Sequence, residues 1–125
     1  MTEFDLRERN VLVAEDEYMM ADQLATELAA VGARVLGPVP SLDRVLDLLE
    51  KTADIDAAVL DINLRGEMVY PAADRLVERK VPFVFTTGYD TSSIPARFEH
   101  IPRCEKPAQA SEITKALKRA LGAQG

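Results

Sequence analysis

The chain has 125 residues, of which 47% are hydrophobic and 29% are charged, and this composition indicates one globular domain rather than a disordered segment. Its net charge is −6, whereas surfaces that bind duplex DNA or anionic membranes are normally basic, so we expect neither nucleic acid nor a membrane as partner. Cys104 is the only cysteine, which excludes an internal disulfide. We expect its thiol to be buried and structural, in a reducing, cytoplasmic setting. Residues 1–10 lack the apolar core of a signal peptide.

Five apolar runs along the chain predict five short β-strands. The third run has no polar break and predicts a strand buried on both faces, as in a parallel sheet. The second run is expected to end at Gly37, stopped by Pro38 and Pro40, and the fifth is short and weak. The runs span residues 11–14, 33–37, 57–60, 82–88 and 101–105.

Between these runs, and after the last one, apolar residues recur at the spacing of a helix. Gly32 is expected just past the first helix, and Ser41 is expected to cap the second. The third helix should start near Tyr70, because the proline that follows fits only in a first turn. The segment after the fourth run is weakly patterned, so any helix there should be short and begin at about Ile94. Ser111 is expected to cap the last helix.

The order is therefore a β-α unit repeated five times, which predicts an α/β domain of the doubly wound (βα)5 type. Its sheet should be parallel, with helices on both faces. We find no linker and no room for a second domain, so we expect residues 1–125 to form one domain with a core at about 11–121 and no output domain.

Polar residues follow four of the predicted strands. In open α/β sheets, ligands bind where the carboxyl ends of strands meet, so we expect these side chains to share one edge. Clustered carboxylates repel one another unless a cation intervenes, and oxygen ligands of this kind favour Mg²⁺. A carboxylate, Mg²⁺, a lysine and a hydroxyl together suit phosphoryl transfer, with the carboxylate as nucleophile. The strand-end residues are Glu15, Asp16, Asp61, Asn63, Thr87 and Lys106.

Each of these features alone also has an ordinary structural explanation. Residues 15–17 could be the acidic first turn of a helix, and Asp61 could cap a turn. Lys106 and Pro107 could be part of a loop. Their occurrence at the ends of successive predicted strands favours a shared site.

The pattern resembles the receiver domain of bacterial two-component response regulators over residues 11–121. The markers are the acid pair Glu15-Asp16, then Asp61, Thr87, and Lys106 followed by a proline. This resemblance implies a flavodoxin-like sheet with strand order 2-1-3-4-5. It also implies that Asp16 and Asp61 bind Mg²⁺ directly, that Asn63 adds its backbone carbonyl, and that Glu15 acts mainly through water.

The resemblance further implies that Asp61 is the phosphoacceptor, loaded from the phosphohistidine of a sensor histidine kinase or a phosphotransfer protein. Thr87 and Lys106 would each hold a phosphoryl oxygen. Lys106 would also pair with Asp61 before phosphorylation, and Thr87 would move afterwards to carry the signal.

Three positions depart from the common receiver pattern. Arg103 stands where a switch aromatic is usual, and Ala108 follows the Lys-Pro pair where an aromatic is frequent. Residues 85–88 read Phe-Thr-Thr-Gly, which is similar to the Phe-Ala-Thr-Gly motif of an atypical, often stand-alone subgroup, with Thr86 in place of alanine. Our hypothesis is that ordering of residues 88–100 replaces the aromatic switch. Tyr89 could cover the site or contact a partner, and His100 is expected in a surface loop.

The resemblance implies a cytoplasmic signalling protein, a monomer or weak homodimer, that acts on a downstream protein target. It would not be an enzyme with turnover, although slow autodephosphorylation is expected. One alternative is a docking pseudo-receiver that is never phosphorylated, and another is a phosphate sink or relay. A less favoured alternative is a phosphatase of the haloacid dehalogenase type. Such enzymes use a second Asp where Asn63 stands, and they usually carry a cap domain, for which 125 residues leave no room.

Overall fold

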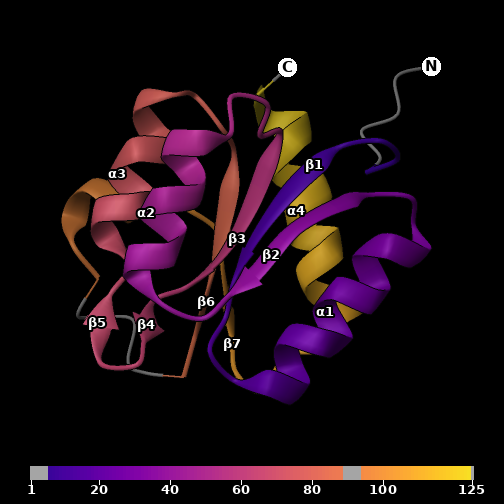
Figure 1. The fold of residues 1–125 in the computed structure, drawn as a ribbon, viewed down its shortest axis with the longest axis horizontal. Helices are drawn as coiled ribbons and strands as arrows, with labels where there is room; N and C mark the ends of the chain where they lie inside the picture. The colour runs from indigo at the N-terminus through magenta and orange to yellow at the C-terminus, as the bar shows by residue number, and fades with distance from the viewer. Residues whose placement is uncertain (1–5, 89–93, 125) are drawn as a thin grey trace.

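The computed structural model describes residues 6–124 apart from 89–93 and contains a central five-stranded sheet between two layers of helices (Figure 1). Neighbouring strands are parallel, in the order β2-β1-β3-β6-β7. The strands β6 and β7 are the fourth and fifth strands of the sequence prediction, because β4 and β5 form a separate hairpin. The predicted flavodoxin-like order 2-1-3-4-5 is therefore confirmed.

The elements follow the predicted alternation closely. The strands of the main sheet are β1 (Asn10–Ala14), β2 (Arg34–Val39), β3 (Ala57–Asp61), β6 (Phe83–Thr87) and β7 (Arg103–Glu105). The helices are α1 (Tyr18–Ala30), α2 (Leu42–Lys51), α3 (Tyr70–Glu78), the 3-10 helix η2 (Ala96–Phe98) and α4 (Ala110–Gln124). Among the described residues, no helix combines the length and apolarity that a membrane span requires.

The sheet separates two hydrophobic cores. Figure 1 shows α1 and α4 on one face and α2 and α3 on the other. Successive side chains of a strand point to opposite faces, so Val59 packs in the core under α1 and α4, whereas Leu60 packs in the core under α2 and α3. Every residue of β3 is buried, as predicted for the central strand of a parallel sheet.

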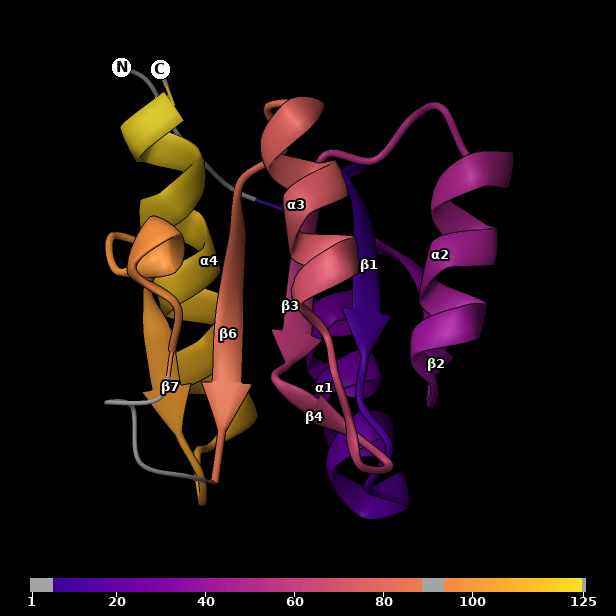
Figure 2. The ribbon, with the colours of Figure 1, turned by 90° about the vertical axis from the view of Figure 1, so that its left-hand side faces the viewer.

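The carboxyl ends of the strands share one edge of the sheet, where the arrowheads point in Figure 2. The hairpin of β4 (Asn63–Leu64) and β5 (Glu67–Met68) lies at this edge. Its two central residues, Arg65 and Gly66, have φ of 54° and 88°, which is the backbone of a type I′ turn. The sequence analysis did not predict this hairpin.

The prediction that β2 stops at Pro38 was wrong, because the strand continues to Val39. Leu12 pairs with Leu36 but Ala14 pairs with Val39, so β2 carries one extra residue, a β-bulge. The missing amide hydrogen of Pro38 is tolerated because β2 is an edge strand.

The helix boundaries agree with the sequence in part. As predicted, α3 starts at Tyr70, and Gly32 follows α1 with a φ of +93°. The last helix begins at Ala110, one residue before the predicted cap Ser111, because the Glu112 carboxylate accepts a hydrogen bond from the Gln109 amide at 3.1 Å. The fourth crossover holds no α-helix in its described part, only the three-residue η2.

Because of the bulge in β2, replacing Gly37 by alanine should destabilise the fold more than the same replacement at Gly66. Both glycines have positive φ. A Cβ added to Gly37 would lie 2.8 Å from the Val39 nitrogen and 2.9 Å from the Val13 oxygen, whereas one on Gly66 would meet nothing within 4 Å. We expect Gly66→Ala to lower the free energy of unfolding by about 1 kcal/mol and Gly37→Ala by roughly 3 kcal/mol or more. Urea denaturation of both variants measures this, and equal losses would contradict the described backbone of the bulge.

Candidate functional site

A lysine joins two buried carboxylates at the carboxyl edge of the sheet. The Lys106 ammonium donates to Asp61 Oδ2 at 2.8 Å and to Glu15 Oε2 at 3.0 Å. These residues come from three strand ends, since Asp61 ends β3, Glu15 follows β1 and Lys106 follows β7. Asp61 is only 4% exposed and Glu15 only 3%. The pairing of Lys106 with Asp61 that the sequence resemblance implies is present.

The β4–β5 hairpin fixes two of the acids through its backbone. Asp61 Oδ1 accepts from the Asn63 amide at 3.2 Å, and Asp16 Oδ2 accepts from the Arg65 amide at 3.0 Å. The Asn63 side-chain oxygen in turn accepts from the Gly66 amide at 2.7 Å, which closes the turn. The unpredicted hairpin therefore positions carboxylates that belong to two different strands.

The three consecutive acids after β1 have different roles in the structure. Glu17 is the N-cap of α1, and its carboxylate accepts from the amides of Met19 and Met20 at 3.0 and 3.2 Å. Glu15 Oε2 accepts from the Glu17 amide at 3.0 Å in addition to Lys106. The ordinary explanation, an acid at a helix N-terminus, thus holds for Glu17 but not for Glu15.

Carboxylate oxygens of Glu15, Asp16 and Asp61 all lie within 4.8 Å of one another, close enough to share a cation. An open pocket of about 520 Å³ adjoins two of these acids. An all-oxygen donor set of this charge suits a hard divalent cation. The pocket is lined by Asp16, Glu17, Asp61, Asn63, Gly88 and Lys106.

The surroundings of Glu15 shift its pKa strongly. Burial raises the pKa of Glu15 from its ordinary 4.5 to about 7, and nearby Asp61 adds to the rise, while the Glu17 amide and Lys106 oppose it. Burial would lower the pKa of Lys106, but its hydrogen bonds to Asp61 and Glu15 outweigh this, so the pKa is raised. Lys106 therefore stays charged, and Glu15 exchanges its proton near neutral pH.

Comparison with known proteins gives the family. No protein-family model matches the sequence, and a search of curated protein sequences also gives no match. Among solved structures, SdrG from Sphingomonas melonis Fr1 is 36% identical over 94% of this chain and 96% of that chain, with a TM-score of 0.76. The structures that match this chain include response regulator receiver domains, SdrG among them. The chain belongs to this receiver family.

Two further solved structures resemble this receiver. SdrG in its BeF3-activated conformation, from Pseudomonas melonis Fr1, is 36% identical over 86% of this chain and 91% of that chain, with a TM-score of 0.69. A response regulator receiver protein from Sinorhizobium medicae WSM419 is 23% identical over 97% of this chain and the whole of that chain, with a TM-score of 0.79. The latter likeness shows the fold alone.

The two threonines at the end of β6 lie on opposite faces of this receiver's sheet. Phe85 packs under α2 and α3, and Val84 packs under α1 and α4. Strand alternation therefore directs Thr87 to the α2–α3 side and Thr86 to the α1–α4 side. Both side chains are buried.

A cluster that the sequence analysis missed fastens the fourth crossover to α3. Arg97 of η2 makes two hydrogen bonds with the Asp74 carboxylate, at 2.9 and 3.1 Å, and its guanidinium carbon lies 4.5 Å from the centroid of the Phe98 ring. Phe98 in turn stacks on Tyr70 with ring centroids 5.5 Å apart. Residues 96–98 are thus already packed, so the hypothesis of ordering over residues 88–100 cannot apply to η2.

The sequence analysis also singled out Cys104, Arg103 and Tyr89. Cys104 is half-buried rather than fully buried, and burial raises the pKa of its thiol, which agrees with a structural role. Arg103 donates to the Glu99 backbone carbonyl at 3.0 Å. Tyr89 lies outside the described residues.

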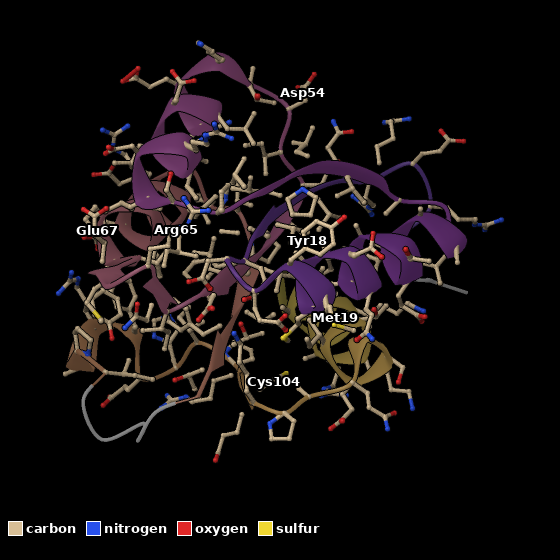
Figure 3. The ribbon with its side chains drawn as sticks, turned by 60° about the horizontal axis from the view of Figure 1, so that its bottom comes forward. Tyr18, Met19, Asp54, Arg65, Glu67 and Cys104 are labelled. Atoms are coloured by element: carbon tan, nitrogen blue, oxygen red, sulfur yellow. The ribbon has the colours of Figure 1, made fainter. Side chains whose placement is uncertain are left out.

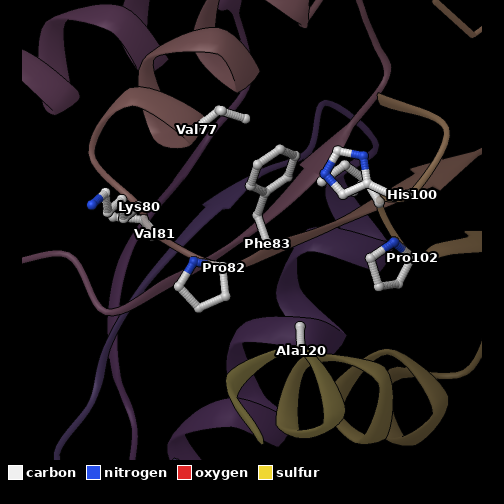
Figure 4. Close-up of a pocket in the computed structure, with 9 residues that line it drawn as sticks. Val77, Lys80, Val81, Pro82, Phe83, His100, Pro102 and Ala120 are labelled. Atoms are coloured by element: carbon white, nitrogen blue, oxygen red, sulfur yellow. The ribbon is translucent and has the colours of Figure 1, made fainter. Parts of the chain in front are cut away.

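His100 is exposed, as expected for a surface loop. It lines a pocket of about 300 Å³ together with Phe83 at the start of β6 and Ala120 of α4 (Figure 4). This pocket lies at the amino ends of the strands, so His100 is remote from the acids.

Two exposed apolar side chains beside the site also escaped sequence analysis. Tyr18 and Met19 begin α1 and are 82% and 67% exposed. Figure 3, seen from the carboxyl edge, shows them with Arg65 of the hairpin to one side. Tyr18 and Arg65 also line a second pocket of about 380 Å³ next to Glu15 and Asp16.

The raised pKa of Glu15 predicts how stability depends on pH. The folded protein holds a proton on Glu15 between pH 4.5 and about 7 that the unfolded chain has lost, so this stabilisation is complete below pH 4.5 and disappears as pH rises through 7. Relative to Glu15→Gln, the wild-type free energy of unfolding should fall between pH 5 and pH 8. Urea denaturation in EDTA measures it, with Glu50→Gln, an exposed acid of α2, as the control. Parallel pH curves for wild type and Glu15→Gln would contradict it.

Proposed function

We propose that this receiver accepts a phosphoryl group on Asp61 from the phosphohistidine of a histidine kinase or a phosphotransfer protein. The observation that carries the proposal is the Asp61 carboxylate, 2.8 Å from the Lys106 ammonium and open to the acid-lined pocket. A carboxylate oxygen attacks phosphorus, and the bond from phosphorus to the histidine nitrogen breaks. The nitrogen keeps the electron pair, and an acyl phosphate is left on Asp61.

The donor set of the pocket fits Mg²⁺. Asp16, Asp61, the Asn63 backbone carbonyl and Glu15 would hold it. When bound, the ion would offset the charge of the phosphoryl oxygens and reduce the repulsion among the acids.

The chain's own residues support the remaining steps. Lys106 keeps its charge and would transfer its hydrogen bond from Asp61 to a phosphoryl oxygen, while the Thr87 hydroxyl would hold another. Gly88 is exposed and lines the same pocket as Asp61, and a Cβ there would meet none of the described residues within 4 Å, so this residue leaves room beside the phosphoacceptor. The exposed Tyr18 and Met19 offer the donor protein an apolar contact beside the site.

The output of this receiver would be a contact with a downstream protein, not turnover of a substrate. Support comes from SdrG, the 36% identical relative that has a BeF3-activated conformation. Thr87 and the segment fastened by Arg97 to Asp74 are the elements through which we expect the signal to pass. Slow autodephosphorylation, the cytoplasmic setting and a role as phosphate sink or relay remain predictions.

The phosphoacceptor assignment predicts a simple mass change. After incubation with acetyl phosphate and Mg²⁺, we expect wild-type protein to gain one phosphoryl adduct, because the Asp61 oxygen displaces acetate from phosphorus. Asp61→Asn should gain none, and EDTA should abolish the wild-type adduct. Intact-protein mass spectrometry measures the adduct in all three samples.

Asp54→Asn is the matched control, since Asp54 is an exposed aspartate outside the site and should leave the adduct unchanged. An adduct that survives in Asp61→Asn would contradict the assignment of Asp61. A folded wild type that binds Mg²⁺ but gains no adduct, and takes none from any histidine kinase, would favour the docking pseudo-receiver instead.

A further inference from the structure

Thr86 carries a polar group that the folded protein leaves unpaired. The residue is 1% exposed, and its Oγ1 makes no hydrogen bond with any of the described residues. It is the only buried side-chain oxygen or nitrogen in the described part of the chain with this property. A buried hydroxyl without a partner costs about 1–3 kcal/mol, so such an exception calls for an explanation.

The strand register places this hydroxyl beside the proposed phosphoacceptor. Thr86 of β6 is in register with Asp61 on β3 and with Cys104 on β7. Paired residues of neighbouring strands direct their side chains to the same face of a sheet, here the α1–α4 face. Thr86 and Asp61 are therefore adjacent on one face.

Lys106 reaches the site across the end of β6, the strand that carries Thr86. The Lys106 amide donates to the Thr87 carbonyl at 2.7 Å, so its backbone lies on the β7 side of β6. Its ammonium nevertheless reaches Asp61 of β3, which lies on the other side of β6. It also reaches Glu15, the residue that follows β1 in the sequence. The Lys106 side chain therefore passes over the carboxyl end of β6, the strand end that carries Thr86 and Thr87.

The polar groups next to the hydroxyl already bond each other. Lys106 and Asp61 are joined at 2.8 Å, and the second Asp61 oxygen accepts from the Asn63 amide. In this state neither group makes a hydrogen bond with Thr86. Phosphorylation of Asp61 would turn its carboxylate into an acyl phosphate, which removes the negative charge of the carboxylate, and would move the Lys106 ammonium to the phosphoryl oxygens, which opens that ion pair.

We propose that Thr86 is a positioning residue whose hydroxyl gains its hydrogen bond only when the Lys106–Asp61 pair opens, so that it favours the phosphorylated state over the unmodified one. This inference rests on the proposed function. The unpaired hydroxyl destabilises the unmodified protein, and its pairing in the loaded protein removes that cost. Thr86 then acts through Lys106 and Asp61, on the opposite face of the sheet from Thr87.

A second buried threonine provides the contrast. Thr114 of α4 is 3% exposed, and its hydroxyl donates to the Ala110 carbonyl at 2.8 Å. Its hydroxyl is satisfied in the unmodified protein, so it has no preference for the loaded state. Replacing each threonine by valine, which has nearly the same shape, should have different consequences at the two positions.

The test compares thermal unfolding and loading with beryllofluoride plus Mg²⁺, which mimics the phosphoryl group without a kinase. Thr86→Val should raise the melting temperature of the unloaded protein by roughly 2–6 °C, because it removes an unpaired hydroxyl. It should also weaken beryllofluoride binding about tenfold and reduce the rise in melting temperature on loading. Thr86→Ser keeps the hydroxyl and should load like wild type, although the lost methyl makes it less stable.

Thr114→Val should be no more stable than wild type and should bind beryllofluoride equally well. If Thr86→Val binds beryllofluoride as tightly as wild type, the inference is overturned, whatever its melting temperature, because the hydroxyl would then be merely tolerated. A wild type that gives no response to beryllofluoride and Mg²⁺ would overturn the proposed function, and this inference with it. A wild type that loads, together with an impaired Thr86→Val and a normal Thr86→Ser, would support both.

Discussion

The site depends on one half-buried lysine between two buried acids. Lys106 bridges Asp61 and Glu15 across the ends of three strands, and with Asp16 nearby the group has one positive charge against three carboxyl groups. A buried ion pair of this kind contributes little net stability, but removing one partner leaves an uncompensated charge and is strongly destabilising. In the proposed function, this excess of acid over base is what would attract a divalent cation to the edge of the sheet.

Local backbone features make this arrangement possible. The β4–β5 hairpin holds Asp61 and Asp16 through the amides of Asn63 and Arg65, and the N-terminus of α1 holds Glu15 through the Glu17 amide. Each acid is thus oriented by a neighbouring amide before any ligand is present. Such preorganisation lowers the cost of assembling the site when a phosphoryl donor arrives.

The sheet and its strand-end residues could be predicted because both are local in sequence. Apolar runs such as residues 57–60 locate the strands, and the residue after each run lies at the carboxyl edge whatever the details of packing. Strand continuity through Pro38 could not be predicted, since it depends on β2 being an edge strand with a bulge. The hairpin after Asp61 was missed because it is only two residues long on each side, too short for a periodic pattern.

Contacts between segments that are distant in the sequence could not be predicted, because they depend on tertiary packing. Nothing in the spacing of Arg97 and Asp74 indicates that they meet, because the pairing depends on how the fourth crossover packs against α3. The unpaired Thr86 hydroxyl was likewise hidden, since the sequence shows a threonine in place of alanine but not whether a partner is within reach. In our proposals, both features affect how the receiver responds to phosphorylation rather than what it binds.

The central claim is that the phosphoryl group goes to Asp61 and to no other acid of the cluster. The most direct measurement is to treat the acetyl phosphate-loaded protein with borohydride, which reduces an aspartyl phosphate to homoserine, and to locate the reduced residue by peptide mass spectrometry. The account predicts homoserine at position 61, with Glu15 and Asp16 unchanged. Reduction at Glu15 or Asp16 with Asp61 intact would contradict it, because Lys106 and the hairpin would then be orienting the wrong carboxylate.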